Sequence, residues 1–131
     1  MADASPRLAR IDTARDAADL IAPRLEHCLN ERLIVLHLDG ERRLIRTTEV
    51  EGCELDVALP IRLIVAAALD CDARGLILAH NHPSGDPEPS EADRQETRRL
   101  AEVTAPLGIA VHDHLVFGGG DCRSFRAMGL V

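Results

Sequence analysis

Apolar positions early in the chain recur at the spacing of a helix. They are Ala17, Ala18, Leu20 and Ile21. Asp12 or Thr13 precedes them and can cap a helix N-terminus, whereas Pro23 should end or kink the helix because proline lacks the required N–H. Residues 1–11 show no such period. We therefore expect a loose N-terminal leader over residues 1–11, followed by a helix.

The next segment has the pattern of paired strands. Residues 32–39, RLIVLHLD, form a β-type apolar run. Its end, Asp39-Gly40, is a strong signal for a two-residue hairpin turn, so residues 41–49 should return as the partner strand. A short strand over residues 54–58 is expected to follow.

The middle of the chain predicts a buried helix, a strand and a loop. Pro60 opens the Ala-rich and Leu-rich segment IRLIVAAALDCDA, which suits a helix with proline in its first turn and Gly75 at its end. Residues 76–79, LILA, are a short apolar strand. Residues 80–89, HNHPSGDPEP, hold three prolines and one glycine and therefore predict a loop.

The last third completes an α/β pattern. The expected elements are a helix from Ser90 to near Pro106 and Gly108, a strand over 109–117, a glycine turn over 118–120, and a short strand or turn over 122–125. Helices that alternate with strands in this way pack on both sides of a sheet. The sequence predicts a single α/β domain over residues 12–131, with helices flanking a central mixed sheet.

Length and composition indicate how many domains the chain forms and in which cellular compartment it is expected. The chain has 131 residues, which suits one domain with one hydrophobic core. No apolar stretch approaches the ~20 residues of a membrane-spanning helix, and the N-terminus lacks the apolar core of a secretory signal. The four cysteines form no C-x-x-C pair, so we interpret them as buried thiols in a reducing compartment: Cys28, Cys53, Cys71 and Cys122. We expect a cytoplasmic protein without membrane contact.

Charge and aromatic content argue against nucleic acid as a partner. The formal net charge is -7, and the aromatic residues are limited to Phe117 and Phe125. Nucleic-acid binding needs a basic face and, for single strands, aromatic side chains on which bases stack. The sequence shows neither feature.

Two histidines and an aspartate form a candidate metal site. His80 and His82 follow the predicted strand 76–79, and side chains two apart in extended chain point the same way. Pro83 favours an extended conformation at His82. Together with Asp93 they give two imidazoles and one carboxylate, which is a three-ligand pattern of catalytic zinc sites with a fourth position open.

The two parts of this pattern, the histidine pair and the aspartate, can each also be explained without a metal. Ser90 followed by Asp93 is a capping box at a helix start, which is compatible with ligation. His80 and His82 alone would suit a polar loop. Neither the longer ββα-metal unit of HNH nucleases nor the H-x-E with P-C-x-x-C signature of zinc deaminases is present.

The chain contains the motif H-x-H-P, followed after six residues by S-x-x-D. This pattern resembles the JAMM (MPN+) metalloprotease motif, whose positions are filled without a gap by His80, His82, Pro83, Ser90 and Asp93. The chain is also similar to the RadC branch of that family over most of residues 13–131. The segments that carry this similarity are LILAHNHPSGDPEPSEAD, IAVHDHLVFGGG and RSFRAMGL. RadC-type proteins usually carry an N-terminal helix-hairpin-helix segment, and this chain is expected to lack one.

The resemblance implies a cytidine-deaminase-like three-layer α/β/α fold, one zinc ion held by His80, His82 and Asp93, and hydrolysis of a peptide or isopeptide bond in a protein or peptide substrate. It also implies a glutamate at the start of the first core strand, where Glu31 stands, as the general base. The other candidates for this base are Glu26, Glu49, Glu51 and Glu54. By analogy with the family serine, Ser90 would donate a hydrogen bond to the oxyanion.

Several alternatives remain open at this level. His112 and His114 also lie two apart on a strand, but we favour a structural role for them. Asp113-His114 matches a pair in RadC-like chains that could orient a ligand histidine. The function could instead be that of a non-catalytic metal-binding module, a DNA-repair-associated protein, or an Fe(II) oxygenase with the same ligand types. The sequence does not mark an oligomeric interface.

Overall fold

The computed structural model describes residues 8–52 and 59–131, and these residues form one mixed five-stranded sheet with the strand order β2-β1-β3-β4-β5. The strands are β1 (Arg32–Leu38), β2 (Leu44–Glu51), β3 (Gly75–Asn81), β4 (Ala110–Gly118) and β5 (Asp121–Ser124). β3 and β4 are parallel, and the other neighbouring pairs are antiparallel. The predicted mixed sheet is confirmed.

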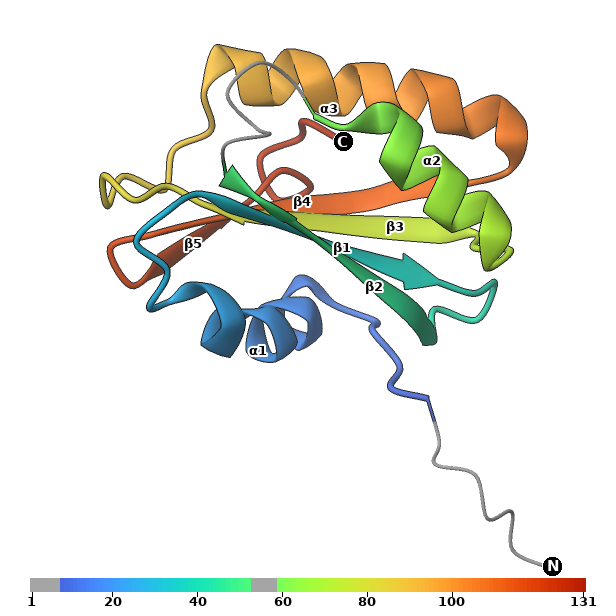
Figure 1. The fold of residues 1–131 in the computed structure, drawn as a ribbon, viewed down its shortest axis with the longest axis horizontal. Helices are drawn as coiled ribbons and strands as arrows, with labels where there is room; N and C mark the ends of the chain where they lie inside the picture. Colours follow the sequence, from blue (N-terminus) through green and yellow to red (C-terminus); the bar gives the residue numbers. More distant parts are fainter. Residues whose placement is uncertain (1–7, 53–58) are drawn as a thin grey trace, which may run out of the picture.

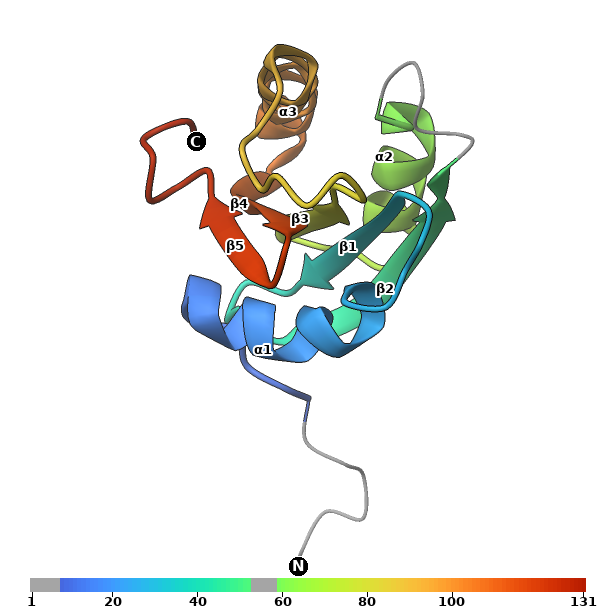
Figure 2. The same cartoon turned by 90° about the vertical axis from the view of Figure 1, so that its left-hand side faces the viewer.

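Helices cover both faces of this sheet. α1 (Ala14–Leu25) lies on one face, and α2 (Ile61–Asp70) and α3 (Glu91–Thr104) lie on the other, as the two views in Figure 1 and Figure 2 agree. α3 connects the parallel strands β3 and β4, which a tight hairpin cannot join. The predicted three-layer α/β/α architecture is therefore confirmed.

Alternation along the strands divides the core into two clusters. Ile34 and Ile77 pack with α1 residues such as Ile21, whereas Leu33 and Leu78 pack on the other face with residues of α2 and α3. The middle strand, β3, is buried at every position, because neighbours flank it on both sides and helices cover both its faces. This burial explains why its sequence is a continuous apolar run.

The structure corrects the predicted hairpin turn. Leu38 pairs with Leu44, so residues 39–43 form a five-residue loop where a two-residue turn was expected. The side chain of Asp39 accepts hydrogen bonds from the N–H groups of Glu41 and Arg43 at 2.8 and 2.9 Å. Arg42, with φ 64, takes the left-handed conformation of the loop. The aspartate thus organises a longer turn through its side chain.

Three other boundaries also differ. Thr13 caps α1, as one of the two predicted candidates, but the helix runs two residues beyond Pro23 to Leu25. α2 ends at Asp70, and Gly75 begins β3 instead of ending the helix. A Cβ at Gly75 would lie 2.2 Å from Nε2 of His112, so this position has no room for a side chain. β3 extends through Asn81, which places His80 inside a strand and not in a loop.

The expected leader is partly packed. Ile11 is buried, and the carbonyl of Ala9 accepts a hydrogen bond from the N–H of Leu44 at 2.7 Å, which ties residues 9–11 to the hairpin. Residues 1–7, the predicted strand over 54–58, and Cys53 lie outside the described residues. The described cysteines are free thiols that are half-buried instead of fully buried: Cys28, Cys71 and Cys122. In residues 8–52 and 59–131, no helix has the length and apolar character needed to cross a membrane.

One buried histidine makes stability depend on pH. His37 is fully buried on β1, its Nε2 lies 2.8 Å from the hydroxyl of Thr48, and its Nδ1 has no partner within the described residues. Burial, with a contribution from the charge of Arg46, lowers the pKa of His37 from 6.5 to about 4. Because protonation then favours the unfolded chain, stability should be complete above the unfolded pKa and fall as pH decreases from 6.5 towards 4.

We expect protonation of His37 to lower the free energy of unfolding of the metal-free protein by on the order of 2 kcal/mol between about pH 7 and about pH 4. Urea unfolding at the two pH values measures the loss. His37→Leu, which cannot be protonated, should lose less stability than the wild type over the same range. An equal loss in both proteins would show that His37 is not responsible.

Candidate metal centre

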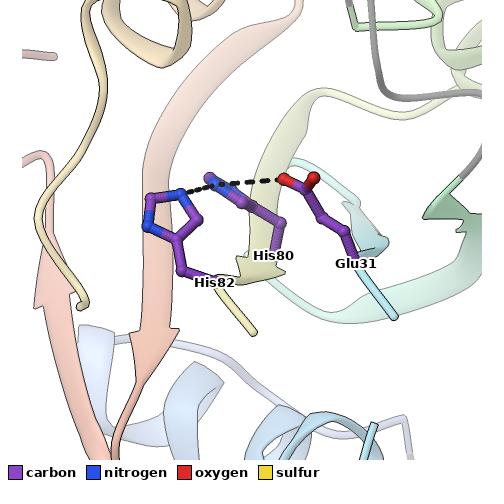
Figure 3. A group of neighbouring side chains, drawn as sticks. All are labelled: Glu31, His80 and His82. Carbon is purple, nitrogen blue, oxygen red and sulfur yellow. Dashed lines mark hydrogen bonds and ion pairs between the residues drawn. The ribbon is translucent and has the colours of Figure 1, made fainter. Parts of the chain in front are cut away.

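Two imidazoles meet at the carboxyl end of β3. His80 continues the row of Leu76 and Leu78 on the face covered by α2 and α3, and His82 follows two residues later, beyond the end of the strand. Figure 3 shows both rings turned towards each other, and their Nε2 atoms are 2.9 Å apart. The two histidines therefore present their Nε2 atoms to one point in space.

A carboxylate oxygen completes a triangle with these nitrogens. Oδ2 of Asp93 lies 3.2 Å from Nε2 of His82 and 3.4 Å from Nε2 of His80. Asp93 is held there by the start of α3, because its Oδ2 accepts the N–H of Ser90 at 2.8 Å and its own N–H donates to Oγ of Ser90 at 3.0 Å. The capping box and the approach to the histidines use the same aspartate.

The dimensions of this triangle suit a tetrahedral ion. Ligand atoms ~2.0 to 2.2 Å from a zinc ion in tetrahedral geometry are ~3.3 Å apart. The three measured separations are 2.9, 3.2 and 3.4 Å. The residues present therefore fit a small divalent cation with only minor adjustment.

Glu31 lies beside the triangle. Its Oε1 is 4.0 Å from Nε2 of His80, and Glu31, His80 and His82 form a group whose ligand atoms lie within 4.8 Å of one another and could hold a metal ion. The side chain of Glu31 is 35% exposed, so it faces the open side of the site. Of the two carboxylates, Asp93 is closer to both histidines.

The other glutamates considered for the base have different surroundings. Glu49 is paired with Arg24 and Glu51 with Arg32, each at 2.7 Å. Glu26 lies 3.7 Å from His27 on the surface. Glu54 lies outside the described residues. Among the described candidates, Glu31 alone belongs to the group with His80 and His82.

Asn81 positions the backbone next to Glu31. This buried side chain points to the opposite face from His80, and its Oδ1 accepts the N–H of Arg32 at 2.7 Å. Its amide also donates to the carbonyl of Asn30 at 3.0 Å. Asn81 therefore ties the segment on both sides of Glu31 to the strand that carries His80. This role of Asn81 was not predicted from the sequence, although its place between the two histidines was a signal.

The ring of His82 is oriented by the loop that follows it. Its Nδ1 donates to the carbonyl of Asp86 at 2.8 Å, which leaves Nε2 with a free lone pair. The loop reaches this position because Gly118 has no side chain: a Cβ there would lie 2.9 Å from backbone atoms of Asp86 and Pro87. A close approach between loop and strand thus selects the nitrogen of His82 that faces the site.

His80 is oriented from the other side by His114. Nδ1 of His80 lies 2.7 Å from Nε2 of His114, and Nδ1 of His114 lies 2.7 Å from Oγ1 of Thr97 on α3. Burial lowers the pKa of His114 well below its ordinary value. His112 lies instead against Gly75, at the other end of β3. The two histidines of β4 therefore do not share a site.

Asp93 is ionised in this environment. Burial alone would raise its pKa, but the neighbouring ring of His80, together with hydrogen bonds from Ser90, holds the pKa of Asp93 well below its ordinary value. An ionised carboxylate beside two imidazole rings supplies ligand types that zinc binds.

A groove of about 490 Å³ adjoins His82 on the α1 side of the sheet. Its walls come from α1, from Asn81 to Pro83, and from the turn between β4 and β5. Its charged lining residues are acidic: Asp19, Glu26 and Asp121. The groove offers space for a segment of extended chain next to His82.

Comparison with known proteins gives matches over nearly the whole chain. The family of RadC-like JAB domains matches residues 11–130. A UPF0758 protein of Symbiobacterium thermophilum is 41% identical over 133 residues, covering 99% of this chain and 56% of the relative. A UPF0758 protein of Rhodobacter capsulatus is 44% identical over 108 residues, covering 82% of this chain and 50% of the relative. The chain thus spans about half the length of these curated relatives.

Proposed function

This chain belongs to the RadC-like JAB domain family, and on that basis we propose that it is a zinc-dependent hydrolase that cleaves a peptide or isopeptide bond. The observation that carries the proposal is the triangle formed by Nε2 of His80, Nε2 of His82 and Oδ2 of Asp93, with Glu31 beside it. A set of three protein ligands with one side open is the arrangement of a catalytic zinc.

In this proposal His80, His82 and Asp93 hold the ion. When bound, zinc polarises a substrate carbonyl and lowers the pKa of water towards ~7. Glu31 lies close enough to the ligands to act on the reacting groups, yet its carboxylate is farther from the histidines than that of Asp93. This difference supports ligation by Asp93 and proton transfer by Glu31.

Glu31 would take a proton from the attacking water and deliver it to the leaving amine. The proposal gives Ser90 a second role. Its Oγ accepts the N–H of Asp93, so its own hydroxyl proton is free to donate to the oxyanion that develops on the carbonyl. A peptide segment on one side of the scissile bond would lie in the groove that adjoins His82.

The place of Asn81 gives a prediction for this mechanism. We expect Asn81→Ala to lower kcat by about tenfold or more while zinc affinity stays near that of the wild type, because the variant frees the segment around Glu31 but touches neither ring nitrogen. Steady-state kinetics and zinc competition with a chromogenic chelator measure the two quantities. A parallel loss of zinc affinity would mean that Asn81 supports the whole site and not Glu31 in particular.

The proposed activity is tested with the zinc-loaded chain and two substrate sets, a mixture of unmodified peptides and a set of isopeptide-linked peptides. Mass spectrometry of the products identifies the bond that is cut. Cleavage that stops when a chelator is added supports the proposal. Tight zinc binding without cleavage of either set would favour a metal-binding module over an enzyme.

A further inference from the structure

We propose that His114 is a positioning residue that makes His80 a metal ligand through Nε2, by keeping the proton of the His80 ring on Nδ1. The inference rests on the proposed metal centre, but it concerns the protein groups behind the ligands. It follows from one continuous series of hydrogen bonds that begins at the backbone of α3 and ends on the ring of His80.

The series starts at a group that can only accept. The hydroxyl of Thr97 lies 2.7 Å from the backbone carbonyl of Asp93, one turn earlier in α3. A carbonyl has no proton to give, so the hydroxyl donates to it. Oγ1 of Thr97 is then an acceptor for its second neighbour, Nδ1 of His114, at 2.7 Å.

The tautomer of each ring follows from this start. His114 carries its proton on Nδ1 and therefore offers the lone pair of Nε2 as an acceptor. Nδ1 of His80, 2.7 Å away, donates its proton to that lone pair. Nε2 of His80 is left unprotonated, and this is the atom that faces Nε2 of His82 and Oδ2 of Asp93.

The series also joins two proposed ligands behind the site. Asp93 contributes its carboxylate to the triangle and its backbone carbonyl to Thr97. A displacement of α3 would therefore move Asp93 and disturb the proton on His80 at the same time. The metal centre is closed by hydrogen bonds on the side that faces the core.

The ring of His114 is itself fixed by the C-terminal segment. The ring of Phe125 stacks on it with centroids 4.7 Å apart and an interplanar angle of 22°. The N–H of Phe125 donates to the carbonyl of His114 at 3.0 Å. Asp113 accepts hydrogen bonds from the N–H of His114 and the hydroxyl of Ser124, each at 2.7 Å. These contacts leave the imidazole little freedom to rotate away from His80.

The tautomers are measured directly by NMR of the ¹⁵N-histidine-labelled, metal-free protein. Long-range ¹H–¹⁵N correlations show which nitrogen of each ring is protonated. We expect Nδ1–H on both His80 and His114. Nε2–H on His80, with an unprotonated Nδ1, would overturn the inference without any variant being made.

Zinc affinity then tests the consequence for the metal. His114→Leu removes the acceptor, and we expect a 10- to 100-fold rise in the zinc Kd, the usual effect of losing a hydrogen bond behind a ligand. Thr97→Val should weaken zinc in the same direction, whereas Thr97→Ser, which keeps the hydroxyl, should restore it. If His114→Leu does not fold, the zinc Kd values of Thr97→Val and Thr97→Ser still test the inference.

Two matched controls separate positioning from general stability. Asn81→Ala removes a buried polar side chain next to His80 that contacts neither of its ring nitrogens, and Ile21→Val loosens the core on the opposite face of the sheet. Both should keep the wild-type zinc Kd. A zinc Kd in His114→Leu that equals those of the controls would overturn the inference and leave the proposed hydrolase intact. Conversely, the expected order of affinities in a protein without hydrolytic activity would support the inference while the proposed function fails.

Discussion

Replacing Glu31 by glutamine is expected to reduce kcat by ~10²- to 10⁴-fold while one zinc ion per chain stays bound. The amide keeps the size of the side chain but cannot take a proton from water. We expect metal to be retained because the triangle is built from His80, His82 and Asp93, and Oε1 of Glu31 lies 4.0 Å from Nε2 of His80. Metal analysis by mass spectrometry and steady-state kinetics on the same sample measure both outcomes.

Glu51→Gln is a suitable control for this variant. Glu51 is also a glutamate at the end of a strand, and it forms an ion pair with Arg32, the residue after Glu31. This surface pair should contribute little, so Glu51→Gln is expected to retain activity within about twofold. Loss of zinc in Glu31→Gln would make Glu31 a ligand, and full activity would remove it from the mechanism.

Replacing His82 by alanine is expected to weaken zinc binding by more than ~100-fold and to abolish turnover, because one of three protein ligands is lost. The fold should persist, since the ring is held by one backbone carbonyl of a loop, that of Asp86, and takes no part in the apolar core. Zinc competition gives the Kd, and circular dichroism checks that the secondary structure is unchanged.

His112→Ala provides the matched control for this loss. It also removes a histidine from an H-x-H pair, but its ring lies against Gly75 at the other end of β3. We expect the zinc Kd and kcat of this variant to stay close to those of the wild type. If His82→Ala binds zinc as tightly as His112→Ala does, the metal is not held by the proposed triangle.

Most of the fold could be predicted because local and tertiary signals agree. The apolar runs in residues 32–38 and in β3 both follow from burial in a sheet covered on both faces. The capping box of Ser90 and Asp93 marks the start of α3 correctly. The hairpin loop was mispredicted because Asp39 forms side-chain hydrogen bonds that the dipeptide Asp39-Gly40 does not reveal.

The residues of the candidate site could be proposed from the sequence, but the residues that orient them could not. Short spacing brings His80 and His82 together, because two positions along a strand share one face. The contact between His80 and His114 depends on the register of β3 and β4, which shifts between Leu76 and Ile77. The sequence could relate Asp113-His114 to a ligand histidine in general terms, but it could not supply the contacts of Thr97 and Asn81 or the protonated nitrogen of each ring.

In the proposed mechanism, hydrolysis depends on one zinc ion held at this triangle. To test this dependence, all metal is removed from the wild-type chain with a chelator, and peptide or isopeptide hydrolysis is measured while zinc is returned in small steps. We expect no activity at the start, a linear rise, and a plateau at one equivalent of zinc per chain. Activity in the metal-free chain, or a fully loaded chain that cleaves no substrate, would contradict this mechanism.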